Sequence, residues 1–281
     1  MQISRLIRAT FLFITTFSIA ACGSVKKSVK NDVNSYMPPS FEENSPAEIM
    51  PEKEKNADVW DTSDVDISHI DKGRKLIAFT FDDAPSKCTE SIFAVFAAFN
   101  EFHPAYSASA TLFVNGLRAI PSSLPLLHAA YALGFELGNH TQQHLDLTKL
   151  SQERIVQEID ETDAILSRID GKERHLLRAP YGAINELVRA QSFTPIIDWT
   201  IDTRDWTGVS PEKIYQAVFE NRFSGAIVLM HDGYENTVEA LKLLLPALMQ
   251  DNYQVVGVSQ LAKAHNCVLK NGSVYIRARK Q

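Results

Sequence analysis

The sequence has little of three features that would each point to a class of protein. It contains 3 cysteines in 281 residues, too few for a small scaffold held together by disulfides. Its 28 Lys and Arg are outnumbered by 34 Asp and Glu, and the only basic stretch is a short one at Lys26–Lys30, which excludes nucleic acid as a partner. The apolar run Ala9–Ala21 is shorter than the roughly 20 residues of a membrane-spanning helix. What is present is 45% hydrophobic residues, enough for one sizeable core.

The first 22 residues have the pattern of an export signal. Arg5 and Arg8 precede the apolar run Ala9–Ala21, and such a charged, then apolar, then small-residue order marks a secretory signal peptide. The run ends in Ile19-Ala20-Ala21-Cys22, which resembles the bacterial lipobox, whose cysteine is acylated and becomes the new N-terminus. The resemblance implies a lipoprotein signal peptide over residues 1–21, a lipid on Cys22, and a membrane-anchored protein of the bacterial cell envelope that faces away from the cytoplasm. An ordinary signal peptide with an incidental Cys22 is the alternative.

The composition divides the rest of the chain into a tether and one folded domain. From Ser24 to about Val65 the chain is rich in Lys, Asn, Ser, Glu and Pro and shows no apolar periodicity. Such a segment cannot offset the entropy of ordering, so residues 22–65 are expected to be a flexible tether. Residues 70–270 form the expected catalytic domain and residues 271–281 a C-terminal tail. We expect a monomer in which Cys88 and Cys267 are free thiols, although an exported protein could pair them.

Short apolar segments alternate with helical patterns from Lys75 onward, which indicates an α/β domain with a parallel sheet. The expected helices are Thr89–Asn100, Ser122–Leu133, one capped by Ser151, one starting at Ser210-Pro211, and Thr237–Met249. The expected strands are Leu76–Phe81, Ala110–Asn115, Phe135–Gly138, Leu176–Ala179, Pro195–Ile201, Ala226–Met230 and Tyr253–Val258. About seven strands suit a (β/α) barrel, and the alternating pattern leaves an open doubly wound sheet as the other possibility.

Polar residues that could carry chemistry follow, or lie at the end of, five of the expected strands. They are Asp82 and Asp83, His140 and His144, Arg178, Asp202 and Asp205, and His231. In a parallel barrel the carboxyl ends of the strands share one face, where active sites lie. The sequence therefore predicts that these five segments converge on one cleft.

The pair His140 and His144 suggests a metal site. Their i,i+4 spacing would put both imidazoles on one side of a helical turn, and imidazole favours Zn²⁺ and similar ions. One carboxylate more gives the three protein ligands of a catalytic zinc site. Taken singly, each residue has an ordinary interpretation as well: an Asp pair in a turn, a surface ion pair at Arg178, and core positions for His231 and Trp206.

Five ordered motifs resemble the polysaccharide deacetylase (NodB-like) family, carbohydrate esterase family 4. They are Thr80-Phe81-Asp82-Asp83, His140-Thr-x-x-His144, Arg178-Ala-Pro-Tyr181-Gly182, Asp202-x-x-Asp205-Trp206 and Leu229-x-His231. The likeness covers roughly Lys75 to Val268. It implies a single catalytic domain folded as a distorted (β/α) barrel of about seven parallel strands.

The resemblance also implies a role for each matching residue. Asp83, His140 and His144 would bind one divalent metal ion, with Zn²⁺ expected and Co²⁺ or another first-row ion as the alternative. Asp82 would be the general base, oriented by Arg178, and His231 the general acid, paired with Asp205. Tyr181 would hold the oxyanion through its backbone N–H, and Trp206 and Leu229 would form an apolar wall beside the acetyl methyl.

The activity implied is metal-dependent hydrolysis of N-acetyl groups on N-acetylglucosamine-containing cell-envelope polysaccharide, with peptidoglycan as the first candidate. The alternatives are an O-acetyl esterase acting on xylan or exopolysaccharide, and a catalytically inactive carbohydrate-binding module on the same scaffold.

The chain departs from the family pattern at two places. Ala84 stands where a glycine usually follows the Asp pair, and we expect it to be unstrained because Pro85 favours extended geometry before it. The segment Asn100–Ala110 looks longer than usual. It is expected to be a surface loop, although it could reshape one end of the substrate groove and bring His103 and Tyr106 to a sugar.

Overall fold

A computed structural model describes residues 59–71 and 73–279 of the chain. The expected signal peptide, Cys22 and most of the expected tether lie outside the described residues. Among the helices that are described, none combines the length and the apolar character needed to cross a membrane.

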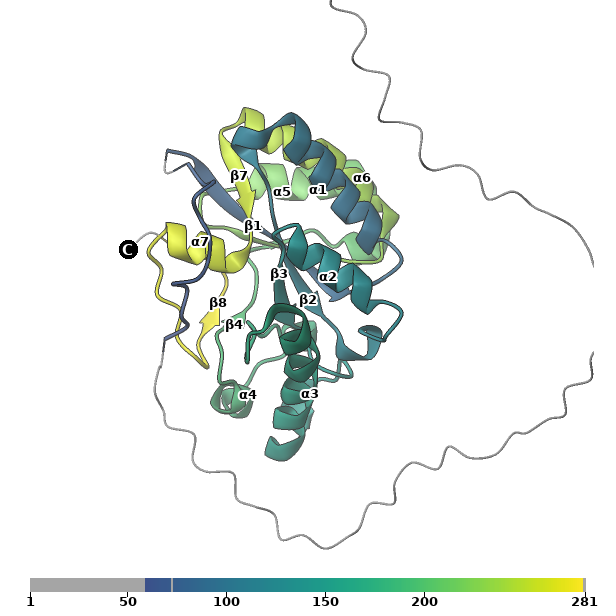
Figure 1. The fold of residues 1–281 in the computed structure, drawn as a ribbon, viewed down its shortest axis with the longest axis vertical. Coiled ribbons are helices and arrows are strands. Elements are labelled where there is room, and N and C mark those ends of the chain that lie inside the picture. The colour runs from purple at the N-terminus through teal and green to yellow at the C-terminus, as the bar shows by residue number, and fades with distance from the viewer. Residues whose placement is uncertain (1–58, 72, 280–281) are drawn as a thin grey trace, which may run out of the picture. The chain divides into compact units, whose positions relative to one another are not determined.

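A parallel sheet built around β1 (Lys75–Ala84) forms the centre of the domain (Figure 1). Its strand order is β3-β2-β1-β6-β5, and β7 also pairs with β1. The other strands are β2 (Thr111–Val114), β3 (Glu136–Asn139), β5 (Ile201–Asp202), β6 (Ile227–His231) and β7 (Tyr253–Val256). Most of their residues are buried, as expected for parallel strands covered on both faces.

Beyond β3, the sheet is continued toward a barrel by the segment around Leu177, which lies beside β3. Leu177 bridges to Asn139 on one side and to β4 (Ile196–Ile197) on the other, both in the parallel sense. Residues 198–200 then lead to β5, which pairs with β6. The expected α/β fold of parallel strands is confirmed, but two expected strands are incomplete. The segment Leu176–Ala179 contributes two bridges at Leu177 instead of a strand, and Pro195–Ile201 is split into β4 and the start of β5.

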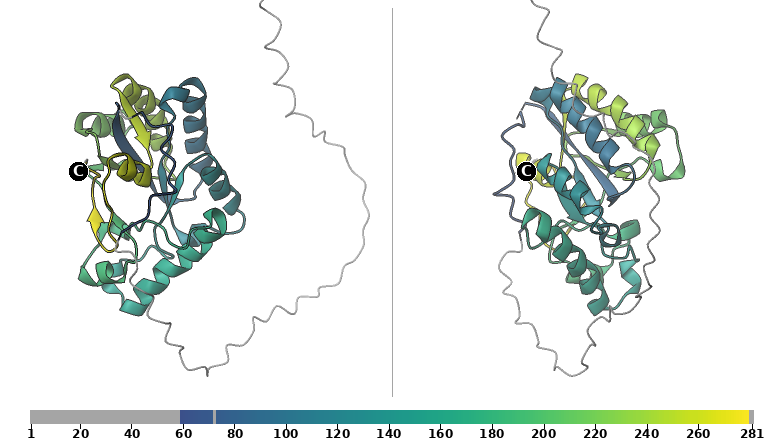
Figure 2. Two further views of the ribbon diagram at one scale, coloured as in Figure 1. Left: turned by 60° about the vertical axis from the view of Figure 1, so that its left-hand side comes forward. Right: turned by 45° about the vertical axis from the view of Figure 1, so that its right-hand side comes forward.

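Helices cover the sheet on both sides (Figures 1 and 2). Three of them, α1, α5 and α6, lie together on one side, while α3 and α4 lie at the opposite end of the domain. The bounds are α1 (Thr89–Phe102), α2 (Leu124–Ala132), α3 (Gln152–Asp170), α4 (Glu186–Gln191), α5 (Pro211–Asn221), α6 (Glu235–Gln250) and α7 (Val258–Ala264). The five expected helices are present, and Ser151 caps α3 by accepting a hydrogen bond from the backbone N–H of Arg154.

The two ends of the described chain are attached to the same part of the domain. Val59 forms a bridge with Lys270, and the backbone N–H of Trp60 donates to the carbonyl of Leu269. Lys263 of α7 donates to the carbonyls of Ser63 and Val65. Residues 59–65, the end of the expected tether, are therefore fastened to the domain. In the expected tail, β8 (Val274–Tyr275) pairs with β4.

The segment Asn100–Ala110 lies at the amino ends of the strands. It contains the end of α1 and a short 3-10 helix, Pro104–Tyr106. The Tyr106 hydroxyl donates to Asn252, which precedes β7, and the Arg74 guanidinium, which precedes β1, lies over the Tyr106 ring. The segment is the expected surface loop, but it is at the opposite end of the strands from Asp82 and His231. It therefore does not reshape a groove at their carboxyl ends. Cys88 and Cys267 are free thiols, as expected.

Candidate active site

The carboxyl end of β1 carries a bulge that places two adjacent aspartates in different surroundings. Phe81 pairs with Leu112 and Ala84 with Val114, so Asp82 and Asp83 face a single residue of β2. A bulge of this kind re-aims side chains at the end of a strand. Asp83 has a φ of 67°, in the left-handed region, whereas Ala84 does not have a positive φ. The expectation that Ala84 is unstrained is confirmed, and the unusual backbone belongs to Asp83.

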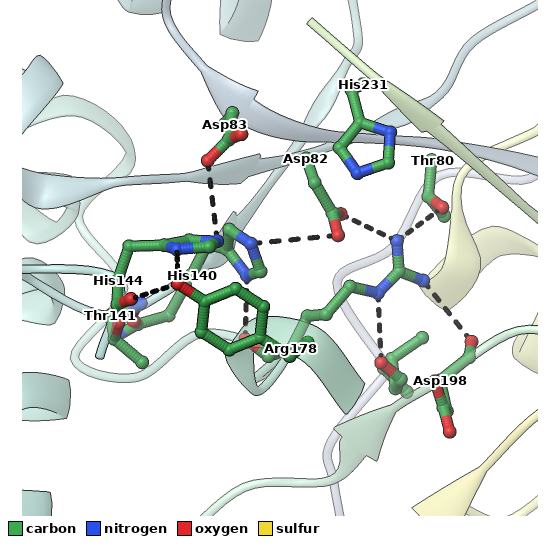
Figure 3. A network of polar contacts seen from close by, with 12 residues as sticks. Thr80, Asp82, Asp83, His140, Thr141, His144, Arg178, Asp198 and His231 are labelled. Atoms are coloured by element: carbon green, nitrogen blue, oxygen red, sulfur yellow. Dashed lines mark hydrogen bonds and ion pairs between the residues drawn. The ribbon is translucent and has the colours of Figure 1, made fainter. Parts of the chain in front are cut away.

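Asp82 is buried beside a guanidinium. Nη1 of Arg178 donates to Oδ1 of Asp82 at 2.8 Å and to the Thr80 hydroxyl at 2.6 Å (Figure 3). Burial by itself would raise the pKa of Asp82, but the charges of Arg178, His140 and His231 outweigh it and hold that pKa below its ordinary value. Asp82 is thus an ionised carboxylate inside the protein, the protonation state that a general base requires.

His140 and His144 come together on a loop after β3, with their ring centroids 4.9 Å apart. The expected helical turn is wrong. Thr141 and His144 both have left-handed backbones, with φ values of 64° and 57°, and a helical turn would need φ near −60°. Nδ1 of His140 lies 2.8 Å from the carbonyl oxygen of Arg178. A carbonyl can only accept, so Nδ1 carries the proton, and in the neutral form of the ring the lone pair is on Nε2.

Asp83, His140 and His144 form a candidate metal site. One ligand atom from each lies within 4.8 Å of the others, the one such group among the residues searched in the described chain. Burial and the neighbouring His140 lower the pKa of His144, which favours the neutral imidazole that a metal needs. Two imidazoles and one carboxylate match the three-ligand set of a catalytic zinc site. The residues present therefore fit a divalent first-row ion.

His231 at the end of β6 is paired with a buried carboxylate. Its Nδ1 lies 2.8 Å from Oδ1 of Asp205, and its backbone N–H donates to Oδ2 of the same residue. Thr237 and the backbone of Trp206 also donate to Asp205. Burial lowers the pKa of His231, but the hydrogen bond and charge of Asp205 outweigh it and raise that pKa above its usual value. The pairing leaves Nε2 available for proton transfer.

The remaining expected site residues are found around this centre. The Tyr181 ring packs edge-on against His144 at 4.8 Å, its hydroxyl lies 3.2 Å from Nδ1 of His144, and its φ is 62°. Leu229 lies in β6 two residues before His231, on the same side of the strand. Trp206 is half-exposed beside Asp205. Asp202 is exposed and accepts a hydrogen bond from the backbone of Arg204 in a turn.

Sequence reasoning gave no role to three residues that support these groups. Thr80 accepts a hydrogen bond from Arg178. It lies two residues before Asp82 and hence on the same side of β1, so its position near the site could have been predicted from the alternation of side chains along the strand. Thr237 holds Asp205 from α6. Arg118 contacts Asp83 from the segment after β2, and no local sequence pattern indicates it.

The fold and the site define a class: an α/β domain of parallel strands whose strand ends combine a candidate metal site, an ionised carboxylate and a carboxylate-paired histidine. Residues 69–193 match the family model described as polysaccharide deacetylase. A peptidoglycan-N-acetylglucosamine deacetylase of Bacillus cereus (strain ATCC 14579) is 34% identical over 203 residues, which cover 69% of this chain and 91% of that protein. The chain belongs to the polysaccharide deacetylase family.

Two further comparisons agree with membership of this family. The peptidoglycan-N-acetylmuramic acid deacetylase PdaC of Bacillus subtilis (strain 168) is 32% identical over 192 residues, which cover 68% of this chain. The chain spans 40% of the length of PdaC. The solved structure of T48 deacetylase with substrate aligns with a TM-score of 0.67 and 30% identity, over 73% of this chain and 99% of that one.

Proposed function

We propose that this protein is a metal-dependent deacetylase that removes N-acetyl groups from N-acetylglucosamine-containing cell-envelope polysaccharide, with peptidoglycan as its substrate. The observation that carries the proposal is the arrangement of Asp82, the group of Asp83, His140 and His144, and His231 at the carboxyl ends of β1, β3 and β6. The relatives named for peptidoglycan deacetylation support the choice of polymer.

The proposed residues divide the hydrolysis of an amide between them. Asp83, His140 and His144 would hold the metal ion, which when bound would polarise the acetyl carbonyl and lower the pKa of water. Asp82, kept ionised by Arg178, takes the proton of the attacking water. The backbone N–H of Tyr181 donates to the oxyanion that develops on the acetyl group. Trp206 and Leu229 form the apolar wall beside the methyl.

His231 favours amide over ester chemistry. An amine leaves poorly unless it is protonated, and Asp205 raises the pKa of His231 above its usual value, which favours the protonated ring that can supply this proton. An O-acetyl ester needs less help at its leaving group. Replacing His231 by Gln should therefore reduce N-deacetylation far more than O-deacetylation. Equal losses on both substrates would favour the esterase alternative.

The metal and the anchor are parts of the same proposal. Two imidazoles and a carboxylate suit Zn²⁺, and Co²⁺ fits the same donors. A lipid at Cys22, after cleavage of residues 1–21, would place the domain in the cell envelope as a membrane-anchored protein facing its polymer. Radiolabelled palmitate incorporation into the wild type but not into Cys22→Ala tests the anchor.

Acetate release tests the activity. The purified protein is incubated with peptidoglycan, chitin oligomers and acetylated xylan, each with added Zn²⁺ and each with a chelator. We expect release from peptidoglycan that the chelator abolishes. Release from xylan alone would support the esterase, and no release from any substrate by the metal-loaded protein would support an inactive binding module.

A further inference from the structure

Arg118 makes two contacts with Asp83, one to its backbone and one to its side chain. It ends the short 3-10 helix Gly116–Arg118 that follows β2. Its Nη1 donates to the backbone carbonyl of Asp83 at 3.0 Å, and its Nη2 lies 3.7 Å from Oδ2 of the Asp83 carboxylate. The guanidinium therefore bridges from the end of β2 to the bulge in β1.

Asp83 needs support from outside its own strand. The bulge takes it out of register with β2, and its φ of 67° is unfavourable for a residue with a side chain. A conformation of this kind persists only where the surroundings fix it. The same conformation is what turns the Asp83 carboxylate toward the imidazoles, with its Oδ1 3.7 Å from Nε2 of His144.

We infer that Arg118 is a positioning residue for Asp83. It fixes the left-handed backbone of Asp83 through the carbonyl and limits the rotation of the carboxylate through Oδ2, so that Oδ1 stays directed at His144. The inference rests on the proposed function, because it takes Asp83 to be a metal ligand. Groups that orient a metal ligand in this way raise the affinity of the site.

The charge of Arg118 acts in the opposite direction. A guanidinium close to a divalent cation repels it, so a purely electrostatic role predicts that removing the charge tightens metal binding. A positioning role predicts that removing the guanidinium weakens metal binding. If Arg118 instead contacts an anionic substrate, removing the guanidinium would leave the metal affinity unchanged and raise KM. The sign of the change in metal affinity separates these roles.

The test is a metal titration of Arg118→Gln, Arg118→Lys and the control Arg168→Gln, whose arginine is exposed on α3. The metal-stripped full chain is titrated with Zn²⁺ against a chromophoric chelator. We expect Arg118→Gln to weaken binding by about tenfold or more, Arg118→Lys to weaken it less, and Arg168→Gln to match the wild type. Thermal unfolding of each metal-free variant checks folding, and if Arg118→Gln fails to fold, the affinity of Arg118→Lys decides.

The outcomes keep this inference apart from the proposed function. Wild-type affinity or tighter binding in a folded Arg118→Gln would overturn the positioning role while leaving the metal site intact. Absence of Zn²⁺ binding by the wild type would overturn the proposed metal site itself, and the inference with it.

Discussion

Two adjacent aspartates have different surroundings because one bulge separates them. Asp82 stays in register with His231 of β6 and is buried against Arg178, whereas Asp83 leaves the β1–β2 register and faces two imidazoles. The proposed base and the proposed metal ligand thus come from neighbouring positions, although side chains of neighbouring strand residues ordinarily point to opposite faces.

The buried pair of Arg178 and Asp82 should be costly to break. Replacing Arg178 by Met leaves the Asp82 carboxylate buried and unpaired, which should lower the free energy of unfolding by about 3–5 kcal/mol. The pKa of Asp82 is lowered in the folded state, so its contribution is present above the unfolded pKa of about 3.9 and is lost as pH falls through the folded value. Urea unfolding should therefore show a difference between wild type and variant that shrinks on acidification. A difference independent of pH would contradict the ionised pair.

The pH dependence of catalysis should respond to Asp205. Because Asp205 raises the pKa of His231, Asp205→Asn should lower that pKa and move the alkaline limb of the pH–rate profile to lower pH. We expect kcat at neutral pH to fall by about 10²-fold. The profile of acetate release measures both effects, with Asp202→Asn, an exposed carboxylate three residues earlier, as the matched control. An unmoved limb in Asp205→Asn would remove His231 as the acid.

The sequence identified the groups of the site but not the way its backbone holds them. Asp82, Asp83, Arg178, Asp205 and His231 could be predicted because each follows an expected apolar strand or lies at its end. The local conformation of the loop that carries His140 and His144 could not, since left-handed backbones at non-glycine residues are uncommon, depend on tertiary contacts and are only weakly signalled by residue type. The contact between Arg118 and Asp83 depends on the bulge, so it could not be predicted from the local sequence either.

At the scale of elements, the C-terminal end of α3 is tied to the sheet by a buried histidine. Nδ1 of His175 lies 2.9 Å from Asp163 and Nε2 lies 3.1 Å from Asp170. Asp163 also accepts a hydrogen bond from Asn139, whose side-chain oxygen accepts from the backbone of Thr141. The helix is therefore connected, through one amide side chain, to the loop that carries His140 and His144.

This tie should make the stability of the domain depend on pH. Burial lowers the pKa of His175, but Asp163 and Asp170 outweigh it and raise that pKa. Its contribution is therefore full below the unfolded pKa of about 6.5 and is lost as pH rises through the folded value. His175→Gln should cost about 1–3 kcal/mol near pH 6 and less at alkaline pH. Urea unfolding at both pH values measures this, and a constant difference would contradict a charged His175.

Elements were predicted best where the apolar pattern was long. The five expected helices and β1 are present because their patterns extend over many residues. The interruption at residues 198–200 was not predictable, because the pairing partner changes there from Leu177 to β6, and a change of partner has no signature in local periodicity. The position of Asn100–Ala110 followed from topology: a link from a helix to the next strand returns to the amino ends of the strands.

At the scale of the whole molecule, the described residues form a domain whose catalytic candidates all lie at one end of its strands. The segment 59–65 is fastened to α7. This arrangement suits a protein that works on a polymer while held at a membrane, as proposed.

The most direct test of the central claim is a titration of metal-stripped protein with Zn²⁺ while acetate release from peptidoglycan is followed. If Asp83, His140 and His144 hold a single catalytic ion, the rate rises with added metal and reaches its plateau at about one equivalent. Undiminished acetate release by the stripped protein, or no release at any amount of metal, would contradict the claim.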